Sequence, residues 1–519
     1  MIRPSKILGR RRVMLSRGNA RSHTMPPPYN GWNARDALIA MKDDDATILD
    51  NWFPERTFVR SRGGTAAHAT GLPSFVESLM TWAGPTSSKM FAASGGTIHE
   101  VSAAAAVGSP DISSLTNARW QHVNFANSAG NYLYIVNGSD APRYYNGSSW
   151  TTPTITGAGL TASNFIHVNA FKNQLWFVEK NSQSFWYFPV ETISGAITEF
   201  DLGPRFTLGG YLVATGTWTV DGSNGPSNYG IFVTSKGEVI IYQGTDPGDA
   251  GAWQHMGTFN IGAPIGRRCL MSVGGEMVVL TSDGFIGLSQ VLPTGRARTD
   301  RAYSDQISGA VEEVIGKHRS NFGWQAILYP DGHKILINIP VAEGKTSHQY
   351  VRNTHTKAWC RFKGWNAGCF EIFNDKLYFG GEGFVDQADT GNSDKGSNIT
   401  CDGRGAFSAL GLPGRLKHLS MMGPYLQANG DVTIKVAVNR DFEETAPTDN
   451  AIPISISGSV WDEAEWDVAE WATAPRTKKY WRGAKGECHN AAVWLNVESQ
   501  AQVEWSGTEM IFTPGGFIG

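Results

Sequence analysis

"WQHVNFANSAGNYLYIVNGSDAPRYYNG", Trp120–Gly147, contains three short apolar segments separated by two turns. The turns are rich in Asn, Gly and Ser, residues that readily adopt the backbone conformations of tight hairpins. The segments between them are rich in Tyr, Val, Ile and Phe, which favour strands over helices. The stretch therefore predicts a small antiparallel sheet of three strands.

The same order of strand and turn recurs along the chain. The repeats begin near residues 75, 119, 164, 210, 267, 321 and 366, at a spacing of roughly 45 to 57 residues. Three or four strands in each repeat is the size of one blade of a β-propeller. A single blade cannot bury both of its faces, whereas blades packed in a ring cover both and leave only short edges.

We therefore predict an all-β fold in which residues 41–400 form a β-propeller with no helix longer than about three turns. Seven repeats are visible, but the fourth is poorly bounded. Seven blades is the central expectation, within a range of six to eight. A pair of β-sandwiches is the competing architecture.

The stretch "MKDDDATILDNWFPERTFVRSRGG", Met41–Gly64, precedes the first full repeat. Asp44 or Asp45 suits the N-cap of a short helix, because its side chain accepts hydrogen bonds from free amides of the first turn. Apolar residues up to Trp52 would form one side of this helix, and Pro54 would end it.

The next segment, Phe58–Arg62, alternates like a strand. Propellers often close when a strand from one terminus completes the last blade. We expect this segment to pair with the strands near Phe384 and so close the ring. Its alternating arginines suit an outer, solvated position.

Residues 401–519 do not continue the repeat of short strands and turns, and they predict a separate C-terminal β-domain. Its strands are longer, with Val432, Ile434, Val436 and Val438 on one face. Trp461, Trp466 and Trp471 stand five residues apart, about 500° on a helix, so they would not share a helix face. We expect the Trp-rich segment 461–481 to contact another subunit or partner, or else to pack the C-terminal domain.

Residues 1–40 predict a basic, extended N-terminal arm, which is either a disordered tail or a segment that becomes ordered against a partner or nucleic acid. The 519-residue chain has a net charge of −3, which argues against a general nucleic-acid coat. Its five cysteines include no C-x-x-C pair, which fits folding in a reducing cytoplasm. No apolar run approaches the roughly 20 residues that span a bilayer, and the N-terminus lacks a secretory signal.

Motifs for chemistry are weak throughout, so we expect no catalytic, cofactor or metal site and no enzyme activity. His348 and His355 have no partner at metal spacing. "GAPIGRR" at Gly262–Arg268 lacks the ending of a phosphate loop and predicts a turn between blades. "TSDGFIGL" at Thr281–Leu288 resembles the Asp-containing turn of sialidase-like propellers but predicts a plain hairpin. One loop holds enough oxygens for calcium, but its spacing favours a solvated loop: Asp386, Asp389, Asn392 and Asp394.

Several stretches together resemble one family, the β-propeller nozzle (tail tubular) proteins of short-tailed bacteriophages. They extend over most of the chain, in an order that makes the resemblance fairly specific. The stretches are "GWNARDALIAMKDDDATILDNWFPERTFVRSRGG", "WQHVNFANSAGNYLYIVNGSDAPRYYNG", "IFVTSKGEVIIYQGTDPGDAGAWQHMGTFNIGAPIGRR", "LTSDGFIGLS" and "VWDEAEWDVAEW".

The resemblance implies a structural protein of the virion tail, made in the host bacterial cytoplasm. Proteins of this family form a homo-oligomeric ring, usually a hexamer, below the portal and its adaptor. The implied partners are further copies of the chain, the tail adaptor, fibres or a tail needle, and genomic DNA passing transiently through the channel. Neither a catalytic residue nor a cofactor is implied, and no stable membrane insertion is expected.

The sequence is also compatible with two other classes of function. One is a propeller of the phage surface that binds or cleaves glycans, since a propeller can bring together carboxylates that are distant in sequence. The other is a cellular propeller that serves as a binding scaffold.

Overall fold

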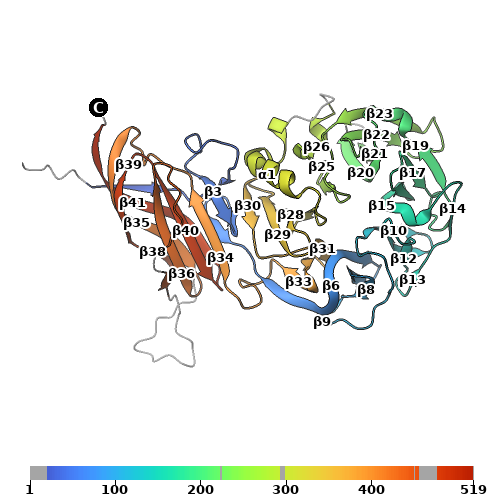
Figure 1. Ribbon diagram of the computed structural model, residues 1–519, viewed down its shortest axis with the longest axis horizontal. Coiled ribbons are helices and arrows are strands. Elements are labelled where there is room, and N and C mark those ends of the chain that lie inside the picture. Colours follow the sequence, from blue (N-terminus) through green and yellow to red (C-terminus); the bar gives the residue numbers. More distant parts are fainter. Residues whose placement is uncertain (1–19, 223–224, 293–298, 449–450, 455–475, 518–519) are drawn as a thin grey trace, which may run out of the picture.

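The computed structural model describes residues 20–222, 225–292, 299–448, 451–454 and 476–517. A ring of small antiparallel sheets lies beside a β-sandwich in which the C-terminal strands predominate (Figure 1). The ring is a β-propeller, so the predicted all-β propeller fold is confirmed.

Seven blades follow one another along the described part of the ring, and they start close to the predicted positions. The fourth, poorly bounded in the sequence, is a full four-stranded sheet. The blades are formed by the second half of β6 (Thr65–Ala83) with β7 (Ser88–Ser94) and β8 (Thr97–Glu100); β10 (Gln121–Asn127), β11 (Gly130–Val136), β12 (Arg143–Tyr145) and β13 (Trp150–Thr151); β15 (Phe165–Phe171), β16 (Gln174–Glu179), β17 (Ser184–Tyr187) and β19 (Thr198–Asp201); β20 (Leu212–Gly222), β21 (Gly225–Thr234), β22 (Glu238–Gly244) and β23 (Trp253–Asn260); β24 (Leu270–Val273), β25 (Glu276–Thr281) and β26 (Gly284–Gly287); β27 (Gln325–Tyr329), β28 (Lys334–Ala342), β29 (Thr346–Asn353) and β30 (Trp359–Phe362); and β31 (Cys369–Phe373), β32 (Lys376–Gly380) and β33 (Glu382–Ala388) with the first half of β6.

Apolar clusters lie between successive blades and hold the ring together. Neighbouring residues of one strand face opposite sides of a blade, so each strand serves two clusters. In the third blade, Phe177 packs on Tyr134 of the second blade at a ring-centroid distance of 5.3 Å. Trp176, the residue before it, stacks on Phe232 of the fourth blade at 5.5 Å. This alternation is how a two-faced sheet buries both faces.

The ring is closed by β6, which is shared between the last blade and the first. Its first half pairs with β33, with Thr70 opposite Phe384, and its second half pairs with β7. Gly71, with a φ of 84°, lies where the strand passes from one blade to the other, a conformation that favours glycine. An N-terminal strand therefore does close the ring, but it is not the predicted segment Phe58–Arg62.

The predicted closing segment instead contributes β5 (Val59–Ser61), which pairs with β4 (Trp52–Pro54) and with β41 (Val503–Phe517) of the sandwich. Val59 is fully buried there. The solvated position expected for its arginines holds only for Arg60, because Arg62 is 2% exposed. Burial of Val59 against the sandwich outweighs any local preference for the propeller edge.

The prediction of a short helix before Pro54 is wrong. This region forms β3 (Asp45–Asp50) and β4 instead. Asp45 accepts hydrogen bonds from the side chains of Asn30 and Asn33 and from the backbone N–H of Lys42, so it binds a loop rather than a helix N-terminus. Pairing of β3 with a C-terminal strand satisfies its backbone and overrides the local helix signal.

The sandwich is built from both ends of the chain. Strands β1 to β5 come from residues 21–61, so part of the predicted arm and the start of the predicted propeller range belong to it. Trp52 and Trp505 face each other in its core with ring centroids 6.1 Å apart. One sheet contains β1 (Arg21–Met25), β4, β5, β35 (Arg415–Ala428), β38 (Arg476–Lys479), β39 (Arg482–Cys488) and β41; the other contains β2 (Gly31–Trp32), β3, β34 (Ile399–Gly405), β36 (Val432–Arg440), β37 (Ile452–Ile454) and β40 (Ala491–Ser499).

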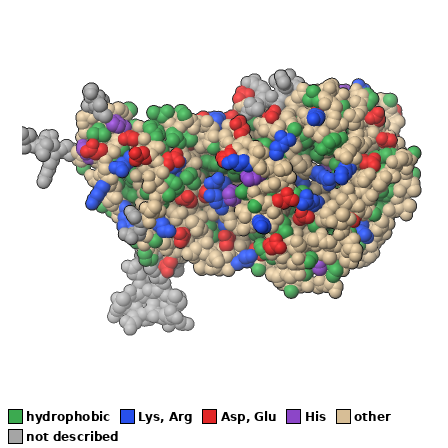
Figure 2. Space-filling model, viewed as in Figure 1, with side chains coloured by type: hydrophobic (Ala, Val, Ile, Leu, Met, Phe, Trp, Pro, Cys, Tyr) green, Lys and Arg blue, Asp and Glu red, His purple; other side chains and the backbone are tan. Residues whose placement is uncertain are grey.

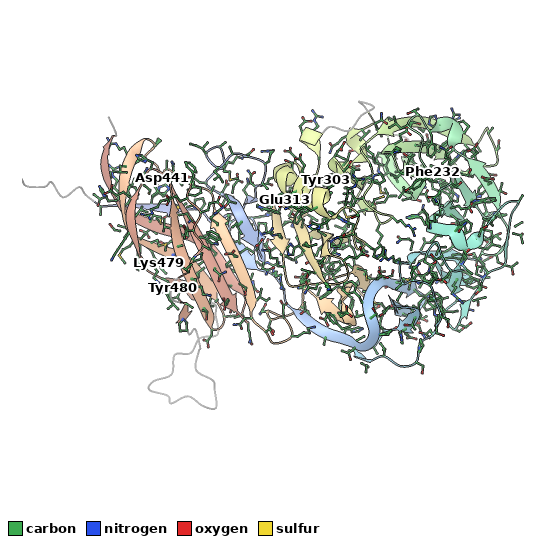
Figure 3. All side chains as sticks on the ribbon, viewed as in Figure 1. Phe232, Tyr303, Glu313, Asp441, Lys479 and Tyr480 are labelled. Carbon is green, nitrogen blue, oxygen red and sulfur yellow. The ribbon has the colours of Figure 1, made fainter. Side chains whose placement is uncertain are left out.

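Phe232 in the fourth blade and Lys479 and Tyr480 in the sandwich mark opposite ends of the molecule (Figure 3).

The one α-helix of the described residues, α1 (Ser308–His318), has 11 residues, about three turns, as expected. Within the described ranges, no helix is long and apolar enough to cross a membrane. Trp461, Trp466 and Trp471 lie outside the described residues.

The remaining elements are short strands and 3-10 helices that precede, follow or connect the blade strands. These are β9 (Ala105–Ala106), β14 (Ile155–Thr156), β18 (Gly195–Ala196), η1 (Ala162–Asn164), η2 (Gly203–Arg205), η3 (Leu288–Gln290), η4 (Thr299–Arg301) and η5 (Asp305–Ile307).

Candidate functional site

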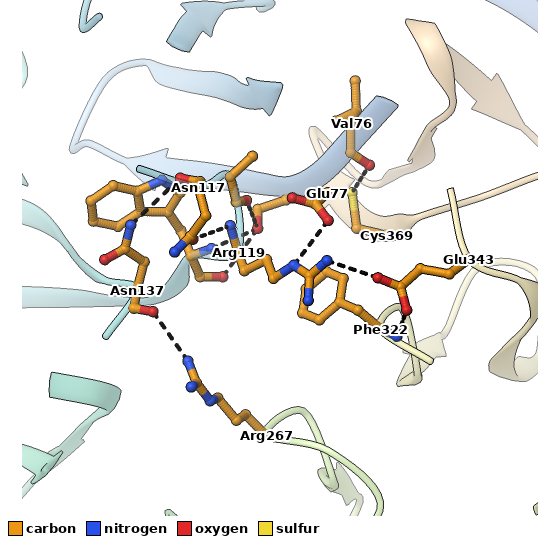
Figure 4. A network of polar contacts seen from close by, with 12 residues as sticks. Val76, Glu77, Asn117, Arg119, Asn137, Arg267, Phe322, Glu343 and Cys369 are labelled. Atoms are coloured by element: carbon orange, nitrogen blue, oxygen red, sulfur yellow. Dashed lines mark hydrogen bonds and ion pairs between the residues drawn. The ribbon is translucent and has the colours of Figure 1, made fainter. Parts of the chain in front are cut away.

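Polar side chains from several blades meet in the middle of the propeller. Arg119, just before β10, donates from Nε to Glu77 of β6 at 3.0 Å and from Nη2 to Glu343, after β28, at 2.8 Å. Its guanidinium also lies 4.4 Å from the ring centroid of Phe322. This network connects the first, second and sixth blades across the ring (Figure 4).

Two adjacent arginines enter the same region from the turn between the fourth and fifth blades. Arg267 donates from Nη1 to the carbonyl oxygen of Asn137 at 3.1 Å (Figure 4). Arg268 donates from Nη2 to Ser78 Oγ at 2.7 Å and to the carbonyl oxygens of Glu77 and Trp120 at 3.0 Å. Burial lowers the pKa of both arginines, and for Arg267 the neighbouring Arg119 lowers it further.

Two neighbouring cavities share these arginines. The larger cavity, of about 350 Å³, is called the outer cavity below, and the smaller, of about 170 Å³, the inner cavity; both are lined by Arg267 and Arg268. The outer cavity is further lined by Arg119, Lys180 and Arg319. The face seen in Figure 2 carries several Lys and Arg side chains near the middle of the propeller.

The inner cavity is lined by buried donors that lack a partner among the described residues. They are Trp120 Nε1, Gln121 Nε2 and Arg268 Nη1, together with the ring nitrogen His167 Nδ1. Burial, and then the charge of Arg267, lower the pKa of His167 to about 4, so its imidazole is neutral at neutral pH. Unpaired buried donors are uncommon in proteins, because each one loses its hydrogen bonds to water.

The turn at Gly262–Arg268 was predicted only to connect blades, and it does so between β23 and β24. Its two terminal arginines are the functional candidates that the sequence interpretation missed. The available signal was a pair of adjacent cations immediately before the first strand of a blade. The predicted hairpin at Thr281–Leu288 is confirmed by the pairing of Thr281 with Gly284.

The loop considered for calcium uses its carboxylates in ion pairs. Asp386 binds Lys395 at 2.7 Å and Asp389 binds Lys334 at 2.6 Å. Asn392 lines a separate surface pocket beside the sandwich. Asp394 binds Arg62. No group of three potential metal-ligating side chains occurs within the described ranges.

The two histidines considered for metal binding do not come together as ligands. His355 stacks on His333 at 4.2 Å between ring centroids. Burial lowers the pKa of His348 to about 4, with Arg361 the next cause.

The cysteines are not arranged as reactive groups. All five are free and buried. Burial raises the pKa of Cys369, beside the inner cavity, to about 12. A thiol with a raised pKa is a weak nucleophile at neutral pH because little thiolate is present.

A second polar centre joins the propeller to the sandwich. Arg361 of β30 donates to both carboxylate oxygens of Asp50 in β3, at 2.6 and 2.9 Å. Lys363 binds the same carboxylate at 2.6 Å. Since β30 and β3 also pair directly, the sixth blade and one sandwich sheet form one continuous sheet.

No protein-family model matches the chain, and no curated protein matches it. Among solved structures, it is similar to the WD40 β-propeller domain of Doa1, with 13% identity and a TM-score of 0.39 over 63% of this chain and 96% of that one. It is also similar to YCF48, determined bound to D1 peptide, with 12% identity and a TM-score of 0.35 over 65% and 96%. BBS1N in complex with ARL6DN matches with 10% identity and a TM-score of 0.29 over 43% and 71%. At such values the matches say nothing about function, and the fold described above rests on the strand pairing of this chain.

Proposed function

We propose that the protein is a structural subunit of a short bacteriophage tail, located in the distal ring, or nozzle, through which DNA leaves. The five stretches that resemble the nozzle family are the sequence basis of this proposal. The structural observation that carries it is the continuous sheet that joins the propeller to the sandwich.

That sheet supports a role in which the two parts move as one body. Domains within a chain are expected to move relative to each other unless their interface is large and apolar. Here a single apolar cluster extends from Ile337 in the sixth blade through Leu49 to Val497 in the sandwich. A wall that surrounds moving DNA must keep its shape, and a two-part subunit without a hinge meets that requirement.

The charge of the chain agrees with a conduit. A lumen rich in Lys and Arg would bind many phosphates and slow the passage of DNA. The net charge of −3 avoids such a general attraction. In this proposal DNA contacts are transient, and the lasting partners are further copies of the chain, the tail adaptor, and fibres or a tail needle.

The proposal is tested with phage particles made without the protein. Particles from a host infected with a gene-deleted phage should contain the portal and adaptor but lack the distal part of the tail, and the wild-type gene supplied in trans should restore it. Gold-labelled antibody should bind the tail tip of complete particles. Normal tails in the deletion, or label confined to the host cell, would contradict the proposal. Release of reducing ends from host polysaccharide by the purified protein would favour the glycan-cleaving alternative.

A further inference from the structure

The outer and inner cavities lie in the middle of the propeller and are together called the propeller channel. The outer cavity has an unbalanced positive charge. It is lined by five cationic side chains, of which Arg119 is paired with Glu77 and Glu343. The other four make no ion pair with a carboxylate of the described residues: Lys180, Arg267, Arg268 and Arg319. Asp and Glu are absent from the described linings of both cavities. Lys180 and Arg319 are exposed, whereas Arg267 and Arg268 are partly buried. Because like charges repel and burial removes part of the hydration of these two arginines, an anion in the cavity would stabilise the arrangement.

The inner cavity supplies a second, independent observation. Gln121, which lines this cavity, is only 8% exposed, and its Nε2 is buried without a partner in the described part of the chain. Trp120 Nε1 and Arg268 Nη1, of two further lining residues, are also buried without a partner among the described residues, and the described lining contains no carboxylate. A cavity lined by residues with unpartnered donors and without carboxylates suits a ligand that consists mainly of hydrogen-bond acceptors.

We propose that the propeller channel binds a phosphate group, with the guanidinium groups of Arg267 and Arg268 as its principal contacts. Guanidinium groups offer planar pairs of N–H donors that match the oxygens of phosphate. The inner cavity provides the neutral donors around the group, and the outer cavity, about 350 Å³, leaves room for a substituent beyond it. Free phosphate and a phosphate monoester share this chemistry. This site is separate from the proposed tail function and does not depend on it.

Binding is measured on the full-length protein by calorimetry at low salt, with inorganic phosphate in one arm and adenosine monophosphate in the other. Both should bind, and chloride at the same ionic strength should not. Tighter binding of the monophosphate would identify an esterified ligand, and equal binding would identify phosphate itself. Absence of heat in both arms would overturn the proposal.

Two variants assign the binding to the channel. Arg267→Gln removes one guanidinium and should weaken phosphate binding by about tenfold or more, as expected for hydrogen bonds to a charged group. Lys180→Gln changes an exposed side chain, so it tests the same cavity without risk to the fold and should weaken binding by about two- to tenfold. The matched control is Lys172→Gln, an exposed lysine of the same blade outside both cavities. Equal affinity in all three variants would overturn the proposal.

Discussion

Arg62 and Asp394, 332 residues apart in the sequence, form a two-pronged ion pair, Nη1 to Oδ1 at 2.9 Å and Nη2 to Oδ2 at 2.6 Å. The side chain of Arg62 is 1% exposed. Its Nε donates to Asn51 Oδ1 at 3.0 Å, and its other donors reach the carbonyl oxygens of Gly63 and Lys363. One buried cation thus ties the N-terminal strands to the end of the propeller and the start of the sandwich.

Replacement of Arg62 should destabilise the whole molecule. Arg62→Met leaves Asp394 without its cation and removes the hydrogen bonds that Arg62 donates to Asn51 and to two carbonyl oxygens. We expect a loss of about 3–5 kcal/mol in the free energy of unfolding, the range for breaking one side of a buried ion pair. The measurement is urea denaturation followed by tryptophan fluorescence.

Arg60→Gln is the matched control for that experiment. Arg60, two residues before Arg62, pairs with Glu55, but its side chain is 26% exposed. Partly exposed pairs contribute about 1 kcal/mol or less, so this variant should unfold close to the wild type. Equal effects of the two substitutions would contradict the role assigned to Arg62.

Closure of the ring by β6 can be tested with proline. Ala69 is 1% exposed and pairs with Val385 of the last blade. Ala69→Pro puts proline in a strand that pairs on both sides, with β33 and with β9, and should cost about 3 kcal/mol or more. Ala105→Pro, on the exposed edge strand β9, should cost much less, because edge positions tolerate proline. Thermal melting of the two variants compares them, and unchanged melting of Ala69→Pro would show that the ring closes elsewhere.

The described end of the Trp-rich segment offers an interface test. Trp481 is 39% exposed, directly precedes β39 of the sandwich, and lies beside Gly423 of β35. Trp481→Ala should leave a soluble, folded chain that fails to join tails, because exposed tryptophans are frequent anchors of interfaces. Trp505→Ala, in the core, should instead cost about 3–5 kcal/mol and reduce soluble yield. Incorporation of the Trp481 variant into complete, infectious particles would exclude this contact.

Stability should depend on pH through His348. Its pKa falls from 6.5 to about 4 in the folded protein, so the unfolded chain binds a proton at a higher pH than the folded chain does. The free energy of unfolding therefore decreases as pH falls from about 6.5 towards 4 and this contribution levels off below that. His348→Asn should lose less stability than the wild type between pH 7 and pH 5, as measured by urea denaturation at each pH. Parallel curves for the wild type and His348→Asn would contradict this assignment.

The blades could be predicted because their signals are local. Turns such as Asn137-Gly138 and the apolar strands beside them specify each hairpin without help from distant residues. Pairing between distant segments is not encoded locally. The stretch from Asp45 to Trp52 has a helix signal of its own, yet it becomes strand because C-terminal strands satisfy its backbone.

The candidate site could not be predicted from the sequence, because its residues come from segments that are distant in the chain. Arg119 and Gln121 lie at the start of β10, whereas Arg267 lies almost 150 residues later in the turn before β24, and only the arrangement of blades in a ring brings the two segments together. Arg62 was expected to be solvated because alternation alone cannot distinguish a solvent-facing side chain from one that meets a buried carboxylate. Its partner Asp394 was considered only as a possible calcium ligand.

The most direct test of the proposed tail function is native mass spectrometry of the full-length protein, alone and with its tail adaptor. The account predicts a closed ring in the presence of the adaptor, with six copies of the chain as the family resemblance implies. The Trp481→Ala variant should remain at the mass of one chain under the same conditions. A wild-type protein that stays a single chain at every concentration and never binds the adaptor would contradict the account.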